Sequence, residues 1–199
     1  MKFWQMLAYM ELDQMLEAAI VAEEVGFTGV MGSDHALYPR NMESPYPYSQ
    51  DGKIFIDADT EFPDTWATTA AMAAVTKTLR FSTSIYILPL RNPLELAKAT
   101  STVSLISNER FILGAGIGWM KEEFDNFGVD FRTRGRRMDE TIEVLNKLWQ
   151  KEWVEHHGEF FQYDGIRVSP QPRERIPIYT GGSSKAALRR AARIADGFI

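Results

Sequence analysis

Residues 109–128 constrain the fold more than any other part of the chain. Residues 111–113, Phe-Ile-Leu, form an apolar run without polar alternation, which is typical of a buried parallel strand. Gly114, Gly116 and Gly118 follow at intervals of two, and helical spacing resumes beyond them. Glycines at a strand end remove side chains where something must lie close to the backbone. The segment therefore predicts an α/β protein in which a strand, a glycine turn and a helix face a ligand.

This glycine turn does not match a dinucleotide-binding fingerprint. The pattern G-x-G-x-x-G requires a third glycine where this chain has Trp119, and an acidic residue about twenty positions later. Arg134, Arg136 and Arg137 occupy that later region, although Asp139 is close. The spacing argues against an NAD site. The alternative is that the glycines only allow the strand and helix to pack closely, but ligand-binding loops of parallel α/β folds lie at such strand ends.

Composition excludes several classes of protein. The chain has 199 residues and no cysteine, which rules out disulfides and cysteine-bound metal. A net charge of −5 argues against a nucleic-acid partner. The first residues do not form a signal peptide, and no apolar run is long enough to cross a membrane. We expect a cytoplasmic protein without a membrane partner.

The rest of the chain alternates strands and helices. Strands are predicted to begin near residues 2, 27, 80, 110, 176 and 197, with helices between them and a small hairpin at 153–168. This alternation predicts a parallel sheet in a single domain over residues 1–199. Residues 36–61 interrupt it with a long segment rich in Tyr, Pro, Asn, Asp and Ser, which is typical of a lid or binding loop.

Asp34 and His35 follow the second predicted strand and are candidates for catalysis. The C-terminal ends of the strands form the mouth of a parallel barrel, where active sites lie. His35 can transfer a proton near neutral pH or donate a hydrogen bond to a ring edge. The alternative is a structural pair that fixes the following loop. His156 and His157 lie in the hairpin, which the topology assigns to the opposite face.

A second candidate site follows the fifth predicted strand, at Gly181, Gly182, Ser183 and Ser184. Free backbone N–H groups and a helix dipole at this position would bind an anion, most simply a phosphate. The alternative is that the serine only caps the helix. No nucleotide-triphosphate loop, G-x-x-x-x-G-K-[ST], is present.

Four arginines, at 132, 134, 136 and 137, precede the fourth long helix, where positive charge is unfavourable. We expect Asp139, Glu140 and residues 122–123 to offset them through internal ion pairs, and the alternative is an anionic ligand. No G-x-S-x-G elbow occurs, so the sequence gives a hydrolase little support.

Several segments together resemble the luciferase-like monooxygenase superfamily, and most closely its deazaflavin-dependent (coenzyme F420) oxidoreductases. The similarity extends over the whole chain. The segments are Ser33-Asp34-His35, Tyr46–Gln50, Leu88–Lys98, the GAGIGWMKEEF stretch, Arg132–Glu140 and Ile176–Ile199. The resemblance implies a (β/α)8 TIM barrel that holds a deazaflavin or FMN across its C-terminal mouth.

The resemblance also assigns expected roles to individual residues. Asp34 and His35 would lie near the cofactor ring. Ser84 and Ile85 fall where relatives have a non-proline cis peptide behind the ring. Residues Gly181, Gly182 and Ser183 would bind the cofactor phosphate, and Gly116 and Gly118 would border the ring or its side chain.

The implied activity is hydride transfer between a reduced deazaflavin and a small organic substrate, with the protein binding, orienting and excluding water. The first alternative is an FMN-dependent monooxygenase, and the second is a non-catalytic flavin-binding or truncated barrel protein.

Relatives of this kind continue for two more βα units, so the barrel and its substrate pocket are expected to be incomplete. A closed barrel has eight strands and typically about 250 residues, whereas six strands are predicted for this chain. Open sheet edges expose unpaired backbone groups and recruit other chains. We therefore expect the isolated chain to be marginally stable and to form a homo-oligomer such as a dimer.

Overall fold

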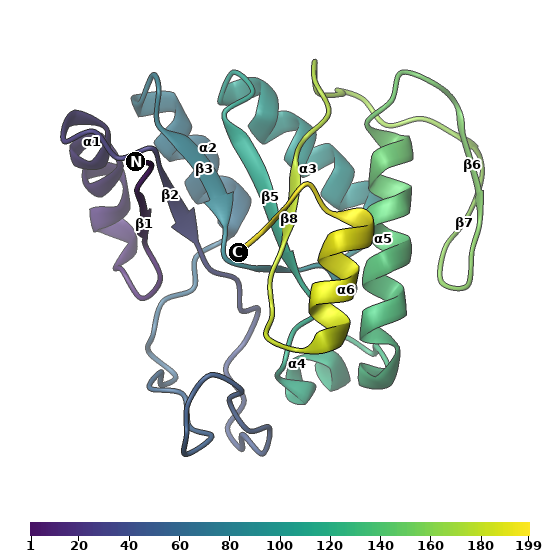
Figure 1. The fold of residues 1–199 in the computed structure, drawn as a ribbon, viewed down its shortest axis with the longest axis horizontal. Helices are drawn as coiled ribbons and strands as arrows, with labels where there is room; N and C mark the ends of the chain where they lie inside the picture. Colours follow the sequence, from purple (N-terminus) through teal and green to yellow (C-terminus); the bar gives the residue numbers. More distant parts are fainter.

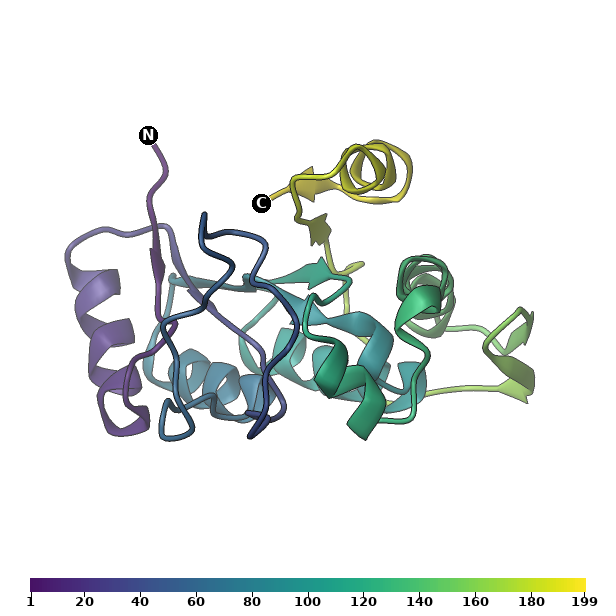
Figure 2. The same ribbon diagram turned by 90° about the horizontal axis from the view of Figure 1, so that it is seen from below.

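The structure, a computed structural model, describes residues 1–199 as a curved parallel sheet with helices on its outer face (Figures 1 and 2). The strands of this sheet are β1 (Trp4–Met6), β2 (Gly29–Gly32), β3 (Arg80–Thr83), β4 (Tyr86–Ile87), β5 (Phe111–Gly116), β8 (Ile178–Thr180) and β9 (Gly197–Phe198). Their order is β1-β2-β3-β5-β8-β9, with β4 paired to β5, and every pairing is parallel. β1 and β9 do not pair with each other, so the sheet is a half-barrel, as predicted.

Helices connect the strands in the predicted order. They are α1 (Met15–Glu24), α2 (Thr65–Val75), α3 (Pro93–Ile106), α4 (Lys121–Asn126), α5 (Arg134–Leu148) and α6 (Lys185–Ile194), with short 3-10 turns η1 (Leu12–Gln14), η2 (Leu88–Leu90) and η3 (Phe131–Thr133). The strand predicted to begin near residue 80 is divided into β3 and β4, because the chain bends at residues 84–85. No helix of the structure combines the length and the apolar character needed to cross a membrane.

Side-chain caps set the starts of α3 and α6. The Asn92 side chain accepts a hydrogen bond of 2.9 Å from the N–H of Leu94, and Pro93 begins α3. The Ser184 hydroxyl accepts one of 3.1 Å from the N–H of Ala187 at the start of α6. Each such cap stabilises its helix by about 1 kcal/mol.

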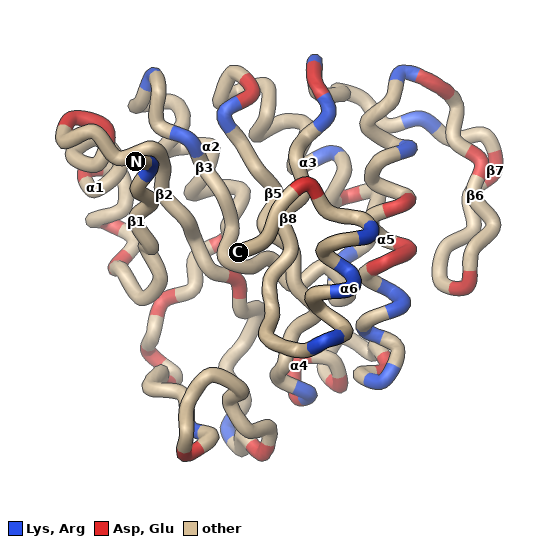
Figure 3. The backbone as a smooth tube through the Cα atoms, viewed as in Figure 1, with Lys and Arg blue, Asp and Glu red and all other residues tan.

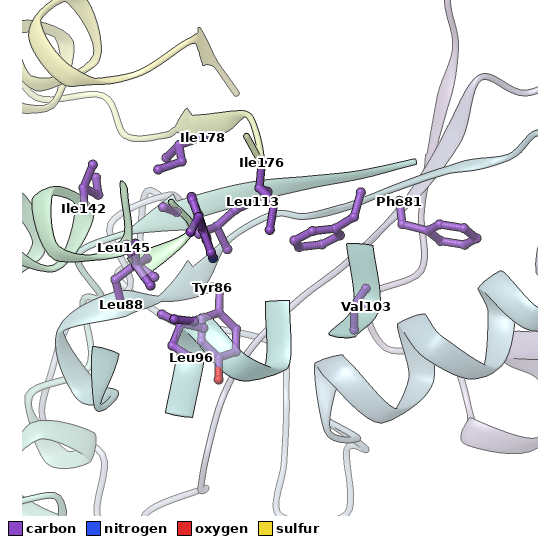
Figure 4. Close-up of a cluster of buried hydrophobic side chains, with 14 of the residues drawn as sticks. Phe81, Tyr86, Leu88, Leu96, Val103, Leu113, Ile142, Leu145, Ile176 and Ile178 are labelled. Atoms are coloured by element: carbon purple, nitrogen blue, oxygen red, sulfur yellow. The ribbon is translucent and has the colours of Figure 1, made fainter. Parts of the chain in front are cut away.

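The hydrophobic core lies between the outer face of the sheet and the helices (Figure 4). Strand residues such as Phe81, Leu113 and Ile178 are almost completely buried. They pack against the apolar faces of α3 and α5, which contribute Val103 and Leu145 among others. Burying side chains of this size contributes roughly 1.5–3 kcal/mol each, which makes this interface the main stabilising contact of the half-barrel.

Glu23 joins the end of α1 to the turn before β3, at the N-terminal ends of the strands. Its carboxylate accepts hydrogen bonds from the backbone N–H groups of Lys77, Thr78 and Leu79 and from the Thr78 hydroxyl. Burial opposes ionisation, but these hydrogen bonds lower the pKa of Glu23 to about 2.

The hairpin of β6 (Val154–His157) and β7 (Gln162–Ile166) packs beside α5. His156 is buried there, with Nε2 3.1 Å from a carboxylate oxygen of Glu140. The same carboxylate accepts hydrogen bonds from the N–H groups of Phe160 and Phe161. This histidine therefore anchors the hairpin to α5.

Candidate active site

A cleft of about 1490 Å³ lies at the C-terminal ends of the strands. Residues at or just after the ends of β1, β2, β3, β5, β8 and β9 line it, together with residues from α4, α5, α6 and the long 36–61 loop. In Figure 1 this loop extends below the ends of β2 and β3. The loop contains no helix or strand, as the sequence predicts.

All seven residues predicted to bind a cofactor line this one cleft. They are Ser84, Ile85, Gly116, Gly118, Gly181, Gly182 and Ser183. The peptide bond between Ser84 and Ile85 is cis, which confirms the geometry expected there. Three segments that are distant in the sequence therefore meet on one surface.

The glycines of the turn after β5 also have a packing role. A Cβ atom on Gly116 would lie 2.2 Å from Cδ1 of Ile85, and one on Gly118 would lie 2.8 Å from the ring of Phe124. Gly118 has a φ of +77°, which disfavours other residues. The close-packing interpretation therefore applies to these glycines, and they also border the cleft.

Asp34 is buried below the cleft and holds the bend between β4 and η2. One carboxylate oxygen accepts a hydrogen bond of 2.9 Å from the N–H of Ile87, and the other is 2.7 Å from Nη2 of Arg91. Burial raises the pKa of Asp34, although the Arg91 guanidinium opposes this. The guanidinium also lies over the ring of Tyr86. Asp34 is thus placed to position the backbone that follows the cis peptide.

His35 turns away from Asp34 and contacts Glu123. Its Nδ1 lies 3.1 Å from Oε2 of Glu123, a side chain with no exposed surface. The other oxygen of Glu123 accepts a hydrogen bond of 2.7 Å from the N–H of Ala36. The imidazole packs edge-on against Trp119 and Phe62. His35 therefore lies immediately behind the cleft lining, held by a buried carboxylate, and its proposed role in proton transfer remains a prediction.

One end of the cleft presents free backbone N–H groups at the start of a helix. The backbone N–H groups of Gly182 and Ser183 donate to no protein acceptor, and α6 begins immediately after them. A Cβ atom on Gly182 would meet that of Ala187 at 3.0 Å, and the φ of Gly182 is +124°. The Ser184 cap is present as well, so the two interpretations of this segment are compatible.

Arginine side chains add positive charge beside this helix start. Basic residues gather along α5 and α6 (Figure 3). Arg134 lines the cleft without an acidic partner, and its Nε is buried without a hydrogen bond. Arg190 of α6 also lines the cleft and donates to the carbonyl of Gly135 at 3.2 Å. The donor set at this end fits a phosphate group.

The prediction of which acidic residues pair with the arginine cluster is wrong. Only Arg136 of the cluster has an acidic partner, and this is Glu159 of the hairpin, at 3.1 Å. Asp139 instead pairs with Arg190 and Arg193 of α6. α6 packs against α5, and this contact cannot be inferred from the spacing of charged residues along the sequence.

The other end of the cleft carries an aromatic wall, formed by Tyr9, Tyr46, Tyr48, Phe55 and Trp119. Tyr46 lies between Tyr48 and Trp119, with ring centroids 5.4 and 5.2 Å away. Tyr9 and Phe55 form an edge-to-face pair at 5.0 Å. Phe62 and His35 stand behind the wall and join its two parts. Edge-to-face packing of this kind fixes ring orientation.

Reciprocal contacts with α4 hold the long loop in place. Glu122 accepts hydrogen bonds of 2.7 and 3.0 Å from the N–H groups of Glu43 and Ser44. The Ser44 hydroxyl accepts one of 2.9 Å from the N–H of Lys121 at the start of α4. Burial acts to raise the pKa of Glu122, but hydrogen bonds from Ser44 and Glu43 lower it to about 2. The carboxylate therefore stays charged, and the loop stays attached, at neutral pH.

The sequence profile of the luciferase-like monooxygenase family matches residues 1–199, and the chain belongs to this family. An uncharacterized protein of Mycobacterium tuberculosis is 37% identical over 200 residues, which span the whole chain and 69% of that relative. An F420-dependent glucose-6-phosphate dehydrogenase of Amycolatopsis mediterranei is 31% identical over 93% of the chain and 52% of that relative.

A solved structure supports the same fold. The oxygenating constituent of 3,6-diketocamphane monooxygenase from Pseudomonas putida, in complex with FMN, superimposes with a TM-score of 0.79 at 20% identity. The match covers 99% of this chain and 57% of that protein. The chain thus spans between about half and two thirds of the length of these proteins.

Proposed function

We propose that this chain is the cofactor-binding part of an oxidoreductase that uses a deazaflavin, coenzyme F420. The observation that carries the proposal is the single cleft at the strand ends, which joins an anion-binding helix start to the Ser84–Ile85 segment. The F420-dependent relative at 31% identity favours deazaflavin, because the FMN-containing structure is only 20% identical and supports the fold alone.

Different residues would bind the cofactor phosphate and orient the cofactor ring. The N–H groups of Gly182 and Ser183, the dipole of α6 and Arg134 would hold the cofactor phosphate. Ile85 would form the surface behind the ring, and Asp34 would hold the backbone two residues further on, at the N–H of Ile87. When bound, the reduced cofactor supplies the hydride.

The opposite side of the cleft would control water and protons. The aromatic wall would exclude water from the reacting atoms, as closure of an active site does. His35 would hold or transfer a proton. Glu123 would accept the hydrogen bond from Nδ1 and so leave Nε2 as the basic nitrogen.

FMN is the second candidate cofactor, since the Pseudomonas putida structure binds it in the same fold. Both cofactors carry a phosphate on a flexible chain, so the anion site serves either. Titration of the purified chain with F420 and with FMN, followed by fluorescence, distinguishes them. We expect tighter binding of F420.

The phosphate site is tested by Gly182→Val. The added side chain would obstruct the free N–H groups, and we expect cofactor affinity to fall about tenfold or more, a loss of at least about 1.4 kcal/mol. Gly165→Val is the matched control, because Gly165 also has a positive φ, of +61°, but lies in the β7 strand of the hairpin. Equal affinity in the Gly182 variant and the wild type would place the phosphate elsewhere. A folded chain that binds neither cofactor would contradict the proposed function.

A further inference from the structure

We propose that the aromatic half of the cleft is the substrate site and that it selects an uncharged substrate with a flat apolar surface, not a phosphorylated sugar. This inference rests on the proposed function, because it takes the cationic half of the cleft as the cofactor's. It depends on three properties of the chain's own residues: exposed aromatic surface, the sign of the nearby charge, and a fixed loop.

The aromatic surface is available to a ligand. Phe55 and Tyr48 keep 80% and 63% of their surface exposed although both line the cleft. Large exposed aromatic side chains in a concave site are typical of ligand contacts. Met6 lies beside them at the end of β1 and also lines the cleft. A ligand with an apolar face would cover this surface and gain the free energy of burial.

The charge at this half repels anions. Glu43, Glu122 and Asp125 line it, and the one basic side chain among the lining residues here is Lys121. Lys121 is neutralised by its ion pair with Asp125. A phosphate monoester placed here would therefore meet acidic groups without a free cation. The cleft-lining cation without an acidic partner is Arg134, at the start of α5.

The site exists before a ligand binds. Glu122 and Ser44 fix the loop to α4 through the three hydrogen bonds described above. The edge-to-face contacts of Tyr46 with Trp119 and Tyr48 fix the rings relative to that anchor. A preformed aromatic surface binds a rigid flat ligand without an ordering cost, whereas it gives a sugar few polar partners.

The experiment compares two probes that share a naphthalene ring and differ by one phosphate group, 2-naphthol and 2-naphthyl phosphate, with glucose 6-phosphate as a third. Each is titrated by calorimetry into the chain saturated with F420. The titrations are repeated without F420 in excess inorganic phosphate, which is added to fill the proposed anion site at the start of α6. We expect 2-naphthol to bind at least tenfold more tightly than either phosphorylated probe in both conditions.

Variants test which residues produce the preference for 2-naphthol. Tyr48→Ala and Phe55→Ala should each weaken 2-naphthol binding about fivefold, while Trp153→Ala, an equally exposed aromatic of the hairpin region, should not change it. Asp125→Asn frees Lys121 and should shift the ratio of affinities several-fold toward 2-naphthyl phosphate.

The outcomes separate this inference from the proposed function. Equal or tighter binding of 2-naphthyl phosphate or glucose 6-phosphate would overturn the inference, as would unchanged 2-naphthol affinity in both aromatic variants. Failure of F420 to bind while the preference for 2-naphthol persists would overturn the proposed function and leave the substrate site supported.

Discussion

Glu23→Gln tests whether the carboxylate between α1 and the turn before β3 stabilises the half-barrel through its charge. Gln keeps the shape and one acceptor oxygen, so it approximates the protonated side chain. The fall in pKa from 4.5 to about 2 corresponds to about 3.4 kcal/mol, at 1.36 kcal/mol for each pKa unit. Glu23 is only partly buried, and solvent screening reduces the expected loss to about 1–2 kcal/mol.

The sign of the pH dependence follows from the lowered pKa. The hydrogen bonds of the native state stabilise the ionised form of Glu23, which the unfolded state does not do. This contribution to the free energy of unfolding is therefore complete above pH 4.5. It is lost as the pH falls toward 2. The free-energy difference between wild type and Glu23→Gln should therefore be largest at pH 7 and should shrink below pH 4.

Urea unfolding followed by circular dichroism at pH 7, 5, 4 and 3 measures this difference. Glu24→Gln is the matched control, because Glu24 is adjacent, exposed and not hydrogen-bonded through its side chain. Cofactor affinity should be unchanged in both variants, since Glu23 lies at the N-terminal ends of the strands. A stability difference below about 0.3 kcal/mol at pH 7, or one that does not vary with pH, would refute the reasoning.

Two further predictions concern residues below and behind the cleft. Arg91→Met leaves the buried carboxylate of Asp34 without its cation and should destabilise the chain by about 3–5 kcal/mol in urea unfolding, whereas a loss under 1 kcal/mol would show that the pair contributes little. His35→Ala should lower turnover of any substrate that the cofactor-loaded protein accepts by about a hundredfold, with little loss of stability. His157→Ala, an exposed histidine of the hairpin, should leave turnover unchanged, and equal rates in the two variants would exclude a role for His35.

The fold and the glycine-rich helix start at the cleft could be predicted from local patterns. Apolar runs indicate buried parallel strands, and the caps at Asn92 and Ser184 depend on residues two and three positions away. The cis peptide at Ser84 and Ile85 was expected from the family resemblance, because nothing in the local residue pattern requires it.

The partners of the predicted catalytic residues could not be found in this way. Glu123 follows Glu122 in a short helix, and the sequence does not distinguish the one that bonds His35 from the one that holds the loop. Arg91 lies in a segment noted only for its resemblance, yet it neutralises Asp34. These contacts join residues more than fifty positions apart, and they arise from strand order, which sets the neighbours of each strand end.

The attachment of the 36–61 loop has a consequence for how this scaffold can change. Hydrogen bonds join the loop to the remainder of the chain at Ala36, Glu43 and Ser44, and at Glu61, whose carboxylate accepts one from the N–H of Leu12. The rings of Tyr46, Tyr48 and Phe55 lie between Ser44 and Glu61 and face the cleft. The ring-bearing residues of the loop can therefore be substituted together, because the helix start that would hold the cofactor lies in a different segment of the chain. A library confined to residues 45–55 would explore new substrates at little cost in folding free energy.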